Sequence, residues 1–545
     1  MLHPYKFISL SITFALLACA CSKDEDKSKH SHSSTTERHL KIASINDPFS
    51  LDPRLVRDLS GASVMRMLYE GLMGNSSNGS IVPAIAESVE ISEDLKTYTF
   101  TLRPSQWSDG TPLSAQDFID TWKSVLSPSF PAPNAYQLYV IKGAKAAKEG
   151  RLPLESIGLK APTQLTLVIE LEQPAPFFLE LTSCHFYFPV HPKWRQQISP
   201  ANLNELEVIG NGPFKLDHWN QRSEFSVIKN PLYWDAGKVQ LDRLTLQILD
   251  EQTALQLFKA NELDWAGSPI STLPQDAIAG LKQEGILNIA YGAGTHWFRF
   301  NTQRPPFLDE QMRRAFGLAL DRQAIIDHVT QGNQLSALGI LPPIFGVDIK
   351  YGYTDHDTDL AKILFQNSLH DLGITKEQLP KITLHYAAND RNHKIAQAIQ
   401  QQWNTTFDIE VSLESTEFNI LNDKMRNGFY QISLGSWYAD FLDPINFLDI
   451  FTSRENPTNQ TFWQNEIYTN LIAASSLETN PKKRLEILGS AEKILIASMP
   501  VAPIYHNAFN YLKNPKVEGI YFSPLGFLNF KEASITAAPL ENHKD

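Results

Sequence analysis

Cysteine is scarce in this chain, whose 545 residues include three cysteines. Cys19 and Cys21 lie close together near the N-terminus, and Cys184 is the remaining one. A single thiol beyond the N-terminus cannot form an intramolecular disulfide, so we expect a fold that does not depend on disulfides. Cys184 is interpreted as a small core residue rather than as a nucleophile.

Basic tracts are also lacking. The chain has 48 Lys and Arg against 60 Asp and Glu, a net charge of −12 at pH 7. No stripe of alternating basic and aromatic residues occurs. Because nucleic-acid binding depends on neutralising phosphates with clustered cations, we expect no nucleic acid among the partners.

The sequence motifs of common enzymes are missing. We find no Gly-x-Ser-x-Gly elbow, no His-Glu-x-x-His pair, no Cys-x-x-Cys and no Gly-x-x-x-x-Gly-Lys-Ser/Thr loop. No His, Cys and Met cluster with metal-ligand spacing occurs in the body of the chain. We therefore expect a protein that is not an enzyme and that holds no cofactor and no metal.

Long apolar runs are absent, and the one short run lies at the N-terminus. It follows Lys6 and covers residues 7–17, which is too short to span a bilayer but fits a signal peptide over residues 1–18. Cys19, preceded by a small residue, is the better candidate for lipidation, and Cys21 is the alternative. An ordinary cleaved signal peptide remains open.

A polar segment follows. Residues 22–38 contain no apolar side chain, so they cannot be buried and predict a flexible, lipid-anchored tether over residues 19–40. His30, His32 and His39 are interpreted as part of this solvated linker rather than as a metal site.

The alternation of aromatic or apolar residues with threonine over residues 97–102 predicts a half-buried strand. Asp109-Gly110 predicts a turn. Ser114 and Asp117, three positions apart, resemble a capping box and predict the start of a helix. The apolar residues that follow share one helical face: Phe118, Ile119, Trp122, Val125 and Leu126.

The amino-acid sequence of residues 83–126 resembles the signature region of the extracellular solute-binding proteins of peptide ABC importers, family 5, of the oligopeptide-binding type. The resemblance covers about residues 41–530. Further segments similar to this family follow in the same order: Ser50-Leu-Asp-Pro53, Leu68–Leu72, Gly210–Leu216, Lys229–Trp234 and Phe298–Asn301.

The resemblance implies an α/β fold, the two-lobed periplasmic-binding-protein-like fold II, with an additional domain and a ligand cleft between the lobes. Lobe I is then discontinuous and comprises residues 41–69, 207–299 and 508–535. The additional domain II covers residues 70–206, and lobe III covers residues 300–507.

The same resemblance implies the substrate-binding component of a peptide ABC transporter, which captures short peptides and delivers them to a membrane permease. ATP hydrolysis then belongs to a separate ATPase subunit. The receptor is expected to be a monomer at the bacterial cell envelope, held by its lipid on the periplasmic or extracytoplasmic face. Receptors of the same fold for muropeptides, nickel chelates or haem remain open, as do a secreted peptidase and an adhesin with a degenerate cleft.

The most informative candidate site follows a strand predicted over residues 429–434, because ligands bind at strand ends in α/β folds. A carboxylate beside aromatic rings is costly to enclose alone, and a peptide ammonium would supply its countercharge and hydrogen-bond donors. In the family, the matching Asp pairs with the ligand's α-ammonium, which implies that role for Asp440. The candidate ligand-binding residues of this segment are Trp437, Tyr438, Ala439 and Asp440.

Three further contacts are implied by the resemblance. Leu59, in a loop, matches a position that touches peptide backbone. Phe418 stands where relatives have a Trp lining a side-chain pocket. His393 matches a His near the C-terminal end of the ligand.

The sequence departs from the family at Leu434-Gly435-Ser436, where relatives often have Arg-Ala-Gly. A cation for a ligand carboxylate is therefore missing, and Lys424 or Arg426 is an alternative for it. Asp443, before Pro444, is interpreted as a turn residue.

Overall fold

The computed structural model describes residues 37–76, 78–197 and 208–536. The chain divides into Met1–Glu37 and Arg38–Asp545, and the second unit is described here by itself. The predicted signal peptide, both candidate lipidation cysteines and most of the predicted tether lie outside the described residues. Within the described ranges, no helix is both long and apolar enough to cross a membrane.

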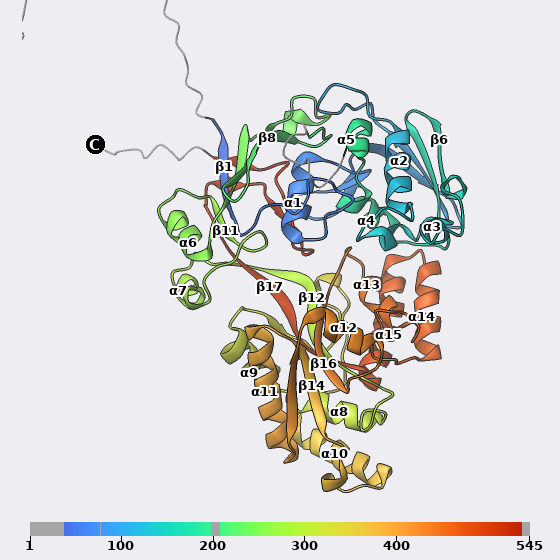
Figure 1. Cartoon of the computed structure of the whole chain (residues 1–545), viewed down its shortest axis with the longest axis vertical. Helices are drawn as coiled ribbons and strands as arrows, with labels where there is room; N and C mark the ends of the chain where they lie inside the picture. Colours follow the sequence, from blue (N-terminus) through green and yellow to red (C-terminus); the bar gives the residue numbers. More distant parts are fainter. Residues whose placement is uncertain (1–36, 77, 198–207, 537–545) are drawn as a thin grey trace, which may run out of the picture. The chain divides into compact units, whose positions relative to one another are not determined.

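One large mixed sheet organises this unit, with strand order β15-β14-β16-β12-β17-β11-β1-β10-β9-β8 and β13 paired to β17. Its two halves are joined by two antiparallel 13-residue strands, β12 (Asn288–Phe300) and β17 (Val501–Lys513) (Figure 1). The other strands are β1 (His39–Ser44), β8 (Phe214–Asn220), β9 (Glu224–Lys229), β10 (Arg243–Ile248), β11 (Trp265–Gly267), β13 (Leu335–Ser336), β14 (Ile382–Ala387), β15 (Val411–Thr416) and β16 (Ile432–Tyr438).

A separate antiparallel sheet has the order β4-β5-β7-β6. Helix α2 (Ala115–Leu126) packs against it and begins at the capping box of Ser114 and Asp117, as predicted. Trp122 on this helix is fully buried. The strands are β4 (Ala86–Ile91), β5 (Thr97–Leu102), β6 (Leu159–Thr163) and β7 (Thr166–Glu170). The predicted strand over residues 97–102 is confirmed as β5.

Helices cover the β14–β16 half of the large sheet (Figure 1). Helix α11 (Asp390–Phe407) lies in the strand-helix-strand unit with β14 and β15, and its Trp403 packs on Phe316 of α8 (Glu310–Leu318) with ring centroids 5.0 Å apart. The remaining longer helices are α1 (Leu59–Leu68), α6 (Glu251–Lys259), α10 (Thr358–Leu372), α12 (Phe418–Arg426), α14 (Glu466–Leu477) and α15 (Pro481–Ser498). The α/β fold class is confirmed.

Short helices and strands complete the described chain. The helices are α3 (Ala144–Lys148), α4 (Phe178–Thr182), α5 (Pro192–Gln197), α7 (Ile278–Gln283), α9 (Arg322–Ile325) and α13 (Ile445–Leu448). The strands are β2 (Met73–Asn75), β3 (Ile81–Pro83), β18 (Val517–Glu518), β19 (Tyr521–Phe522), β20 (Leu528–Asn529) and β21 (Ser534–Ile535).

Two predicted boundaries are wrong. The strand predicted over residues 429–434 is β16, which continues to Tyr438 because β12 pairs with it along its whole length. Opposite Tyr438 stands Gly294, where a Cβ would come 2.5 Å from the tyrosine ring, so glycine makes this pairing possible. Strand β1 begins at His39, inside the predicted tether.

A fully buried carboxyl lies on α15. Glu492 Oε1 accepts a hydrogen bond from the Leu341 backbone at 2.9 Å, while Oε2 has no partner among the described residues. Burial raises the pKa of Glu492 from 4.5 to about 7. The folded state therefore holds a proton that the unfolded state releases between these two values, and stability falls as pH rises through that window.

We predict that Glu492→Gln is more stable than wild type at pH 8, by about 2–3 kcal/mol, since the amide needs no proton. At pH 4.5 the difference should nearly vanish. Urea unfolding of both proteins at both pH values measures this. An equal difference at the two pH values would contradict it.

Candidate functional site

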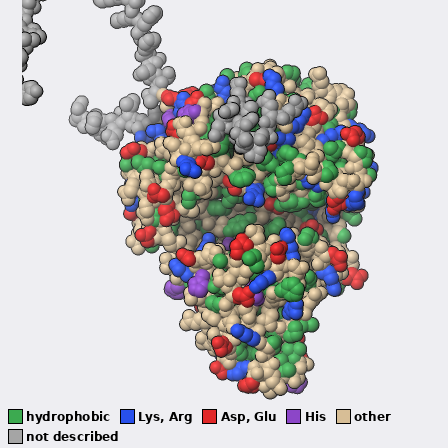
Figure 2. Space-filling model, viewed as in Figure 1, with side chains coloured by type: hydrophobic (Ala, Val, Ile, Leu, Met, Phe, Trp, Pro, Cys, Tyr) green, Lys and Arg blue, Asp and Glu red, His purple; other side chains and the backbone are tan. Residues whose placement is uncertain are grey.

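Figure 2 shows a hollowed band across this face of the described chain, between its upper and lower parts. A cavity of about 580 Å³ is lined by residues far apart in the sequence. They come from 78–79, 176, 344–345, 442–444, 478–485 and 521–524. The predicted site segment, residues 437–440, ends two residues before one wall of this cavity.

The predicted site residue Asp440 lies at the meeting of three elements. Tyr136, in the short 3-10 helix Ala135–Leu138, donates a hydrogen bond to Asp440 Oδ2 at 3.0 Å across 304 positions of sequence. Asn446 Oδ1 accepts from the Asp440 backbone N–H at 3.2 Å and from Trp437 Nε1 at 2.9 Å. Asn446 thus fixes Trp437 and Asp440 relative to each other.

No countercharge for the Asp440 carboxylate is found among the described residues. Burial raises its pKa, while hydrogen bonds from Tyr136, Asn446 and Gln137 act in the opposite direction, and no cationic side chain of the described residues contributes. A carboxylate of this kind is stabilised by any donor that brings a positive charge. The site can therefore receive a ligand cation.

Strand β16 has an open edge beside this carboxylate. It pairs with β12 over all seven residues, but on its other side β14 pairs only with Ile432 and Ser433. No described strand lies along this other edge from Leu434 to Tyr438. Unpaired backbone groups at a strand edge are a template for an added extended chain.

Aromatic side chains lie next to the same strand. Tyr438 is 42% exposed, and its hydroxyl lies 2.9 Å from His296 Nε2. The ring of His296 stacks on Tyr505 at 4.6 Å, and Arg391 donates to the Tyr505 hydroxyl at 3.3 Å. Burial lowers the pKa of His296 to about 3, so this imidazole is neutral at neutral pH. Tyr136, His296 and Arg391 carry no motif by which the sequence could have singled them out.

The other predicted contacts are more scattered. Leu59 is 39% exposed and begins α1 rather than lying in a loop, because Asp58 caps this helix by accepting from the Gly61 backbone at 2.7 Å. Phe418, the first residue of α12, is 64% exposed. His393 lies on α11, with Nδ1 2.6 Å from the Tyr386 hydroxyl. Within the described residues, no side-chain hydrogen bond, ion pair or ring contact joins these three to Asp440.

Two further residues of the segment have structural partners. Ala439 is buried, and its backbone N–H donates to Ala293 at 2.8 Å. Asp443 does form the predicted turn, accepting from the Ile445 backbone at 2.9 Å. Asp443 also makes a bidentate ion pair with Arg484 of α15 at 2.6 and 2.9 Å, which the sequence did not reveal. This pair attaches the site segment to α15.

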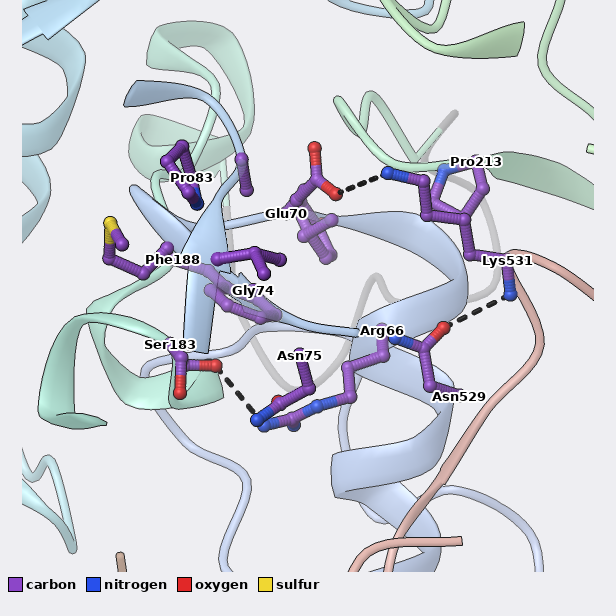
Figure 3. Close-up of a pocket in the computed structure, with 14 residues that line it drawn as sticks. Arg66, Glu70, Gly74, Asn75, Pro83, Ser183, Phe188, Pro213, Asn529 and Lys531 are labelled. Atoms are coloured by element: carbon purple, nitrogen blue, oxygen red, sulfur yellow. Dashed lines mark hydrogen bonds and ion pairs between the residues drawn. The ribbon is translucent and has the colours of Figure 1, made fainter. Parts of the chain in front are cut away.

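A second cavity is much smaller, about 40 Å³, and is already filled by its own interactions (Figure 3). Arg66 donates to the Ser183 carbonyl at 3.2 Å, and Lys531 lies 3.6 Å from Glu70. Glu70 also accepts from Tyr233 at 2.6 Å. Because its polar side chains are paired with one another, we interpret this small cavity as part of the protein's packing rather than as a ligand site.

The structure combines a hollow beside one continuous sheet, an open strand edge and a carboxylate with no cationic partner among the described residues. These features define an α/β binding protein with a ligand cleft. The family model of the bacterial extracellular solute-binding proteins, family 5 (middle), matches residues 80–459. The chain belongs to this family.

Individual relatives are similar over nearly the whole chain. The oligopeptide-binding protein OppA of Bacillus subtilis is 38% identical, covering 91% of this chain and 92% of that protein. The murein peptide-binding protein MppA of Escherichia coli is 30% identical over 88% and 89%. Among solved structures, the unliganded open form of MppA has a TM-score of 0.79 at 28% identity, covering 92% of this chain and 98% of that one. Haemophilus influenzae OppA in complex with the peptide RPPGFSPFR has a TM-score of 0.73 at 27% identity, covering 92% and 99%.

Proposed function

We propose that this protein is the substrate-binding component of a peptide ABC importer, which captures short peptides in its cleft and presents them to a permease. The observation that carries the proposal is the Asp440 carboxylate, which has no cationic partner among the described residues and stands just beyond the open edge of β16. A free peptide amino terminus supplies the charge, and the peptide backbone supplies the hydrogen bonds. The named relatives that bind oligopeptides and murein peptides support this assignment.

The remaining contacts are proposed on the same basis. Trp437 and Tyr438 would flank the bound backbone, Phe418 would line a side-chain pocket, and Leu59 would touch the peptide backbone. His393 would lie near the peptide's C-terminal end. The proposed organisation is the two-lobed one with an additional domain, and hinge closure would enclose the ligand.

The test is mass spectrometry of ligand released from the purified, denatured protein, followed by incubation of the emptied protein with a defined peptide mixture. Intact peptide at one per protein is the expected result. Cleavage products would indicate a peptidase, and the absence of any ligand would favour an adhesin. Nickel or haem released in stoichiometric amounts would replace the peptide assignment by a chelate receptor.

A receptor for cell-wall peptides is the second candidate. The similarity to MppA, a murein peptide-binding protein, favours it. Released ligand containing diaminopimelate or D-amino acids would select this candidate over general peptides.

We further propose that the mature protein is held to the membrane by a lipid on Cys19. Cys19→Ser should then move the protein from the membrane fraction to the soluble fraction, because the acyl chains are lost while the folded unit is untouched. Fractionation with immunoblotting measures this. Retention of Cys19→Ser combined with release of Cys21→Ser would transfer the lipid to Cys21, and retention of the double variant would contradict lipidation.

A further inference from the structure

Arg299 of β12 is a buried cation without an anionic partner among the described residues. It is 8% exposed, and no hydrogen bond or ion pair to it is found within residues 37–76, 78–197 and 208–536. Its guanidinium lies 5.6 Å from the Trp297 ring centroid. Burial lowers the pKa of Arg299, Tyr430 acts in the opposite direction, and no carboxylate of the described residues contributes. An enclosed charge of this kind is costly unless an anion completes it.

The guanidinium of Arg299 lies directly over Gly435. A Cβ at position 435 would come 1.9 Å from Arg299 Nη1, so only glycine leaves room for it. In the sheet Arg299 pairs with Ser433 and is therefore the diagonal neighbour of Gly435 on the same face, within reach of a long side chain. Gly435 belongs to the Leu434–Ser436 segment, where the sequence lacks the expected cation.

This position borders the path proposed for the ligand. Gly435 and Ser436 are half-buried, and the β16 edge that they share has no described strand beside it. An extended ligand lying along β16 from Asp440 would reach Gly435 after roughly 15 Å, which corresponds to about four residues. The alternative cations fit less well, since the Lys424 ammonium is already paired with Glu414 at 2.5 Å and Arg426 is exposed on α12.

We infer that Arg299 receives a carboxylate of the bound ligand, with Gly435 providing the space for its guanidinium. The inference rests on the proposed function and adds a substrate class: ligands that carry a cation at one end and a carboxylate about four residues away. The carboxylate comes either from the C-terminus of a short peptide or from an acidic side chain at that position.

The experiment is calorimetric titration with two sets of ligands. The first set is tetra-alanine as the free acid and as the C-terminal amide. The second set is amidated alanine tetrapeptides with Glu, or Gln as its neutral counterpart, placed in turn at positions two, three and four. The proteins are wild type, Arg299→Gln, Gly435→Ala and the control Lys424→Gln.

We expect wild type and Lys424→Gln to prefer the carboxylate ligand by about 10- to 100-fold, the usual contribution of hydrogen bonds to a charged group. Arg299→Gln and Gly435→Ala should lose this preference and still bind the neutral ligand. A preference within the acid and amide pair assigns the carboxylate to the C-terminus, and one within a Glu and Gln pair assigns it to a side chain. Arg299→Gln should be no less stable than wild type, because it removes a buried charge.

The inference is overturned if wild type binds peptides with no preference for the carboxylate ligand. It is also overturned if Arg299→Gln and Gly435→Ala show the same preference as wild type. Either result leaves the proposed function standing. Loss of the preference in Lys424→Gln alone also overturns it. A wild-type protein that binds no peptide of either set overturns the proposed function, and the inference with it. Should Arg299→Gln fail to fold, Gly435→Ala decides the question.

Discussion

Asp440→Ala should nearly abolish the binding of peptides with a free amino terminus. Removing one partner of an enclosed ion pair costs about 3–5 kcal/mol, which corresponds to roughly two to three and a half decades in affinity. The Asp440 carboxylate accepts a hydrogen bond from Tyr136, its backbone N–H donates to Asn446, and no cation among the described residues contributes, so the ligand is its countercharge in this proposal.

The control for this prediction is a modified ligand, an N-acetylated peptide, rather than a second protein variant. N-acetylated peptides lack the ammonium and should bind wild type almost as weakly as free peptides bind Asp440→Ala. The two losses should not add, because both remove the same interaction. Calorimetric titration of both proteins with both peptides completes the cycle. If acetylation weakens binding equally in the two proteins, the amine is bound elsewhere.

Arg484→Met should destabilise the folded protein by about 3–5 kcal/mol, because it leaves the Asp443 carboxylate buried and unpaired. Both side chains are nearly enclosed, at 9% and 11% exposure, and two hydrogen bonds join them. Urea unfolding measures the loss. Adding Asp443→Asn to Arg484→Met should recover part of it, since the amide carries no charge while its oxygen can still accept from the Ile445 backbone.

A matched control is available on the surface. Arg151 pairs with Glu149, but these side chains are 64% and 41% exposed. Arg151→Met should therefore change stability by no more than about 1 kcal/mol, the usual range for solvated pairs. Similar losses in Arg151→Met and Arg484→Met would show that burial does not govern the Asp443 pair.

Local patterns in the sequence were sufficient for several elements of the fold. The alternation over residues 97–102 and the capping box of Ser114 predicted β5 and the start of α2, and both are present. These signals depend on neighbours in sequence, which is why they can be seen before folding.

Strand pairing decided where the site segment lies. Nothing local to residues 429–438 predicts that β12 extends β16 to Tyr438 while β14 stops at Ser433 and leaves an open edge. Likewise, Leu59 begins a helix because Asp58 caps it, although the sequence suggested a loop.

The sequence by itself, through its motifs and their order, determined the α/β class, the family and Asp440 as the candidate anchor. Only the tertiary structure showed the surroundings that give this carboxylate its chemistry. Tyr136 donates a hydrogen bond to Asp440 across 304 positions of sequence, and the pairing of β12 with β16 places the Arg299 guanidinium next to Gly435. A side chain's charge can be recognised from its residue type, but its burial and its partners depend on segments far apart in sequence, which only the folded chain brings together.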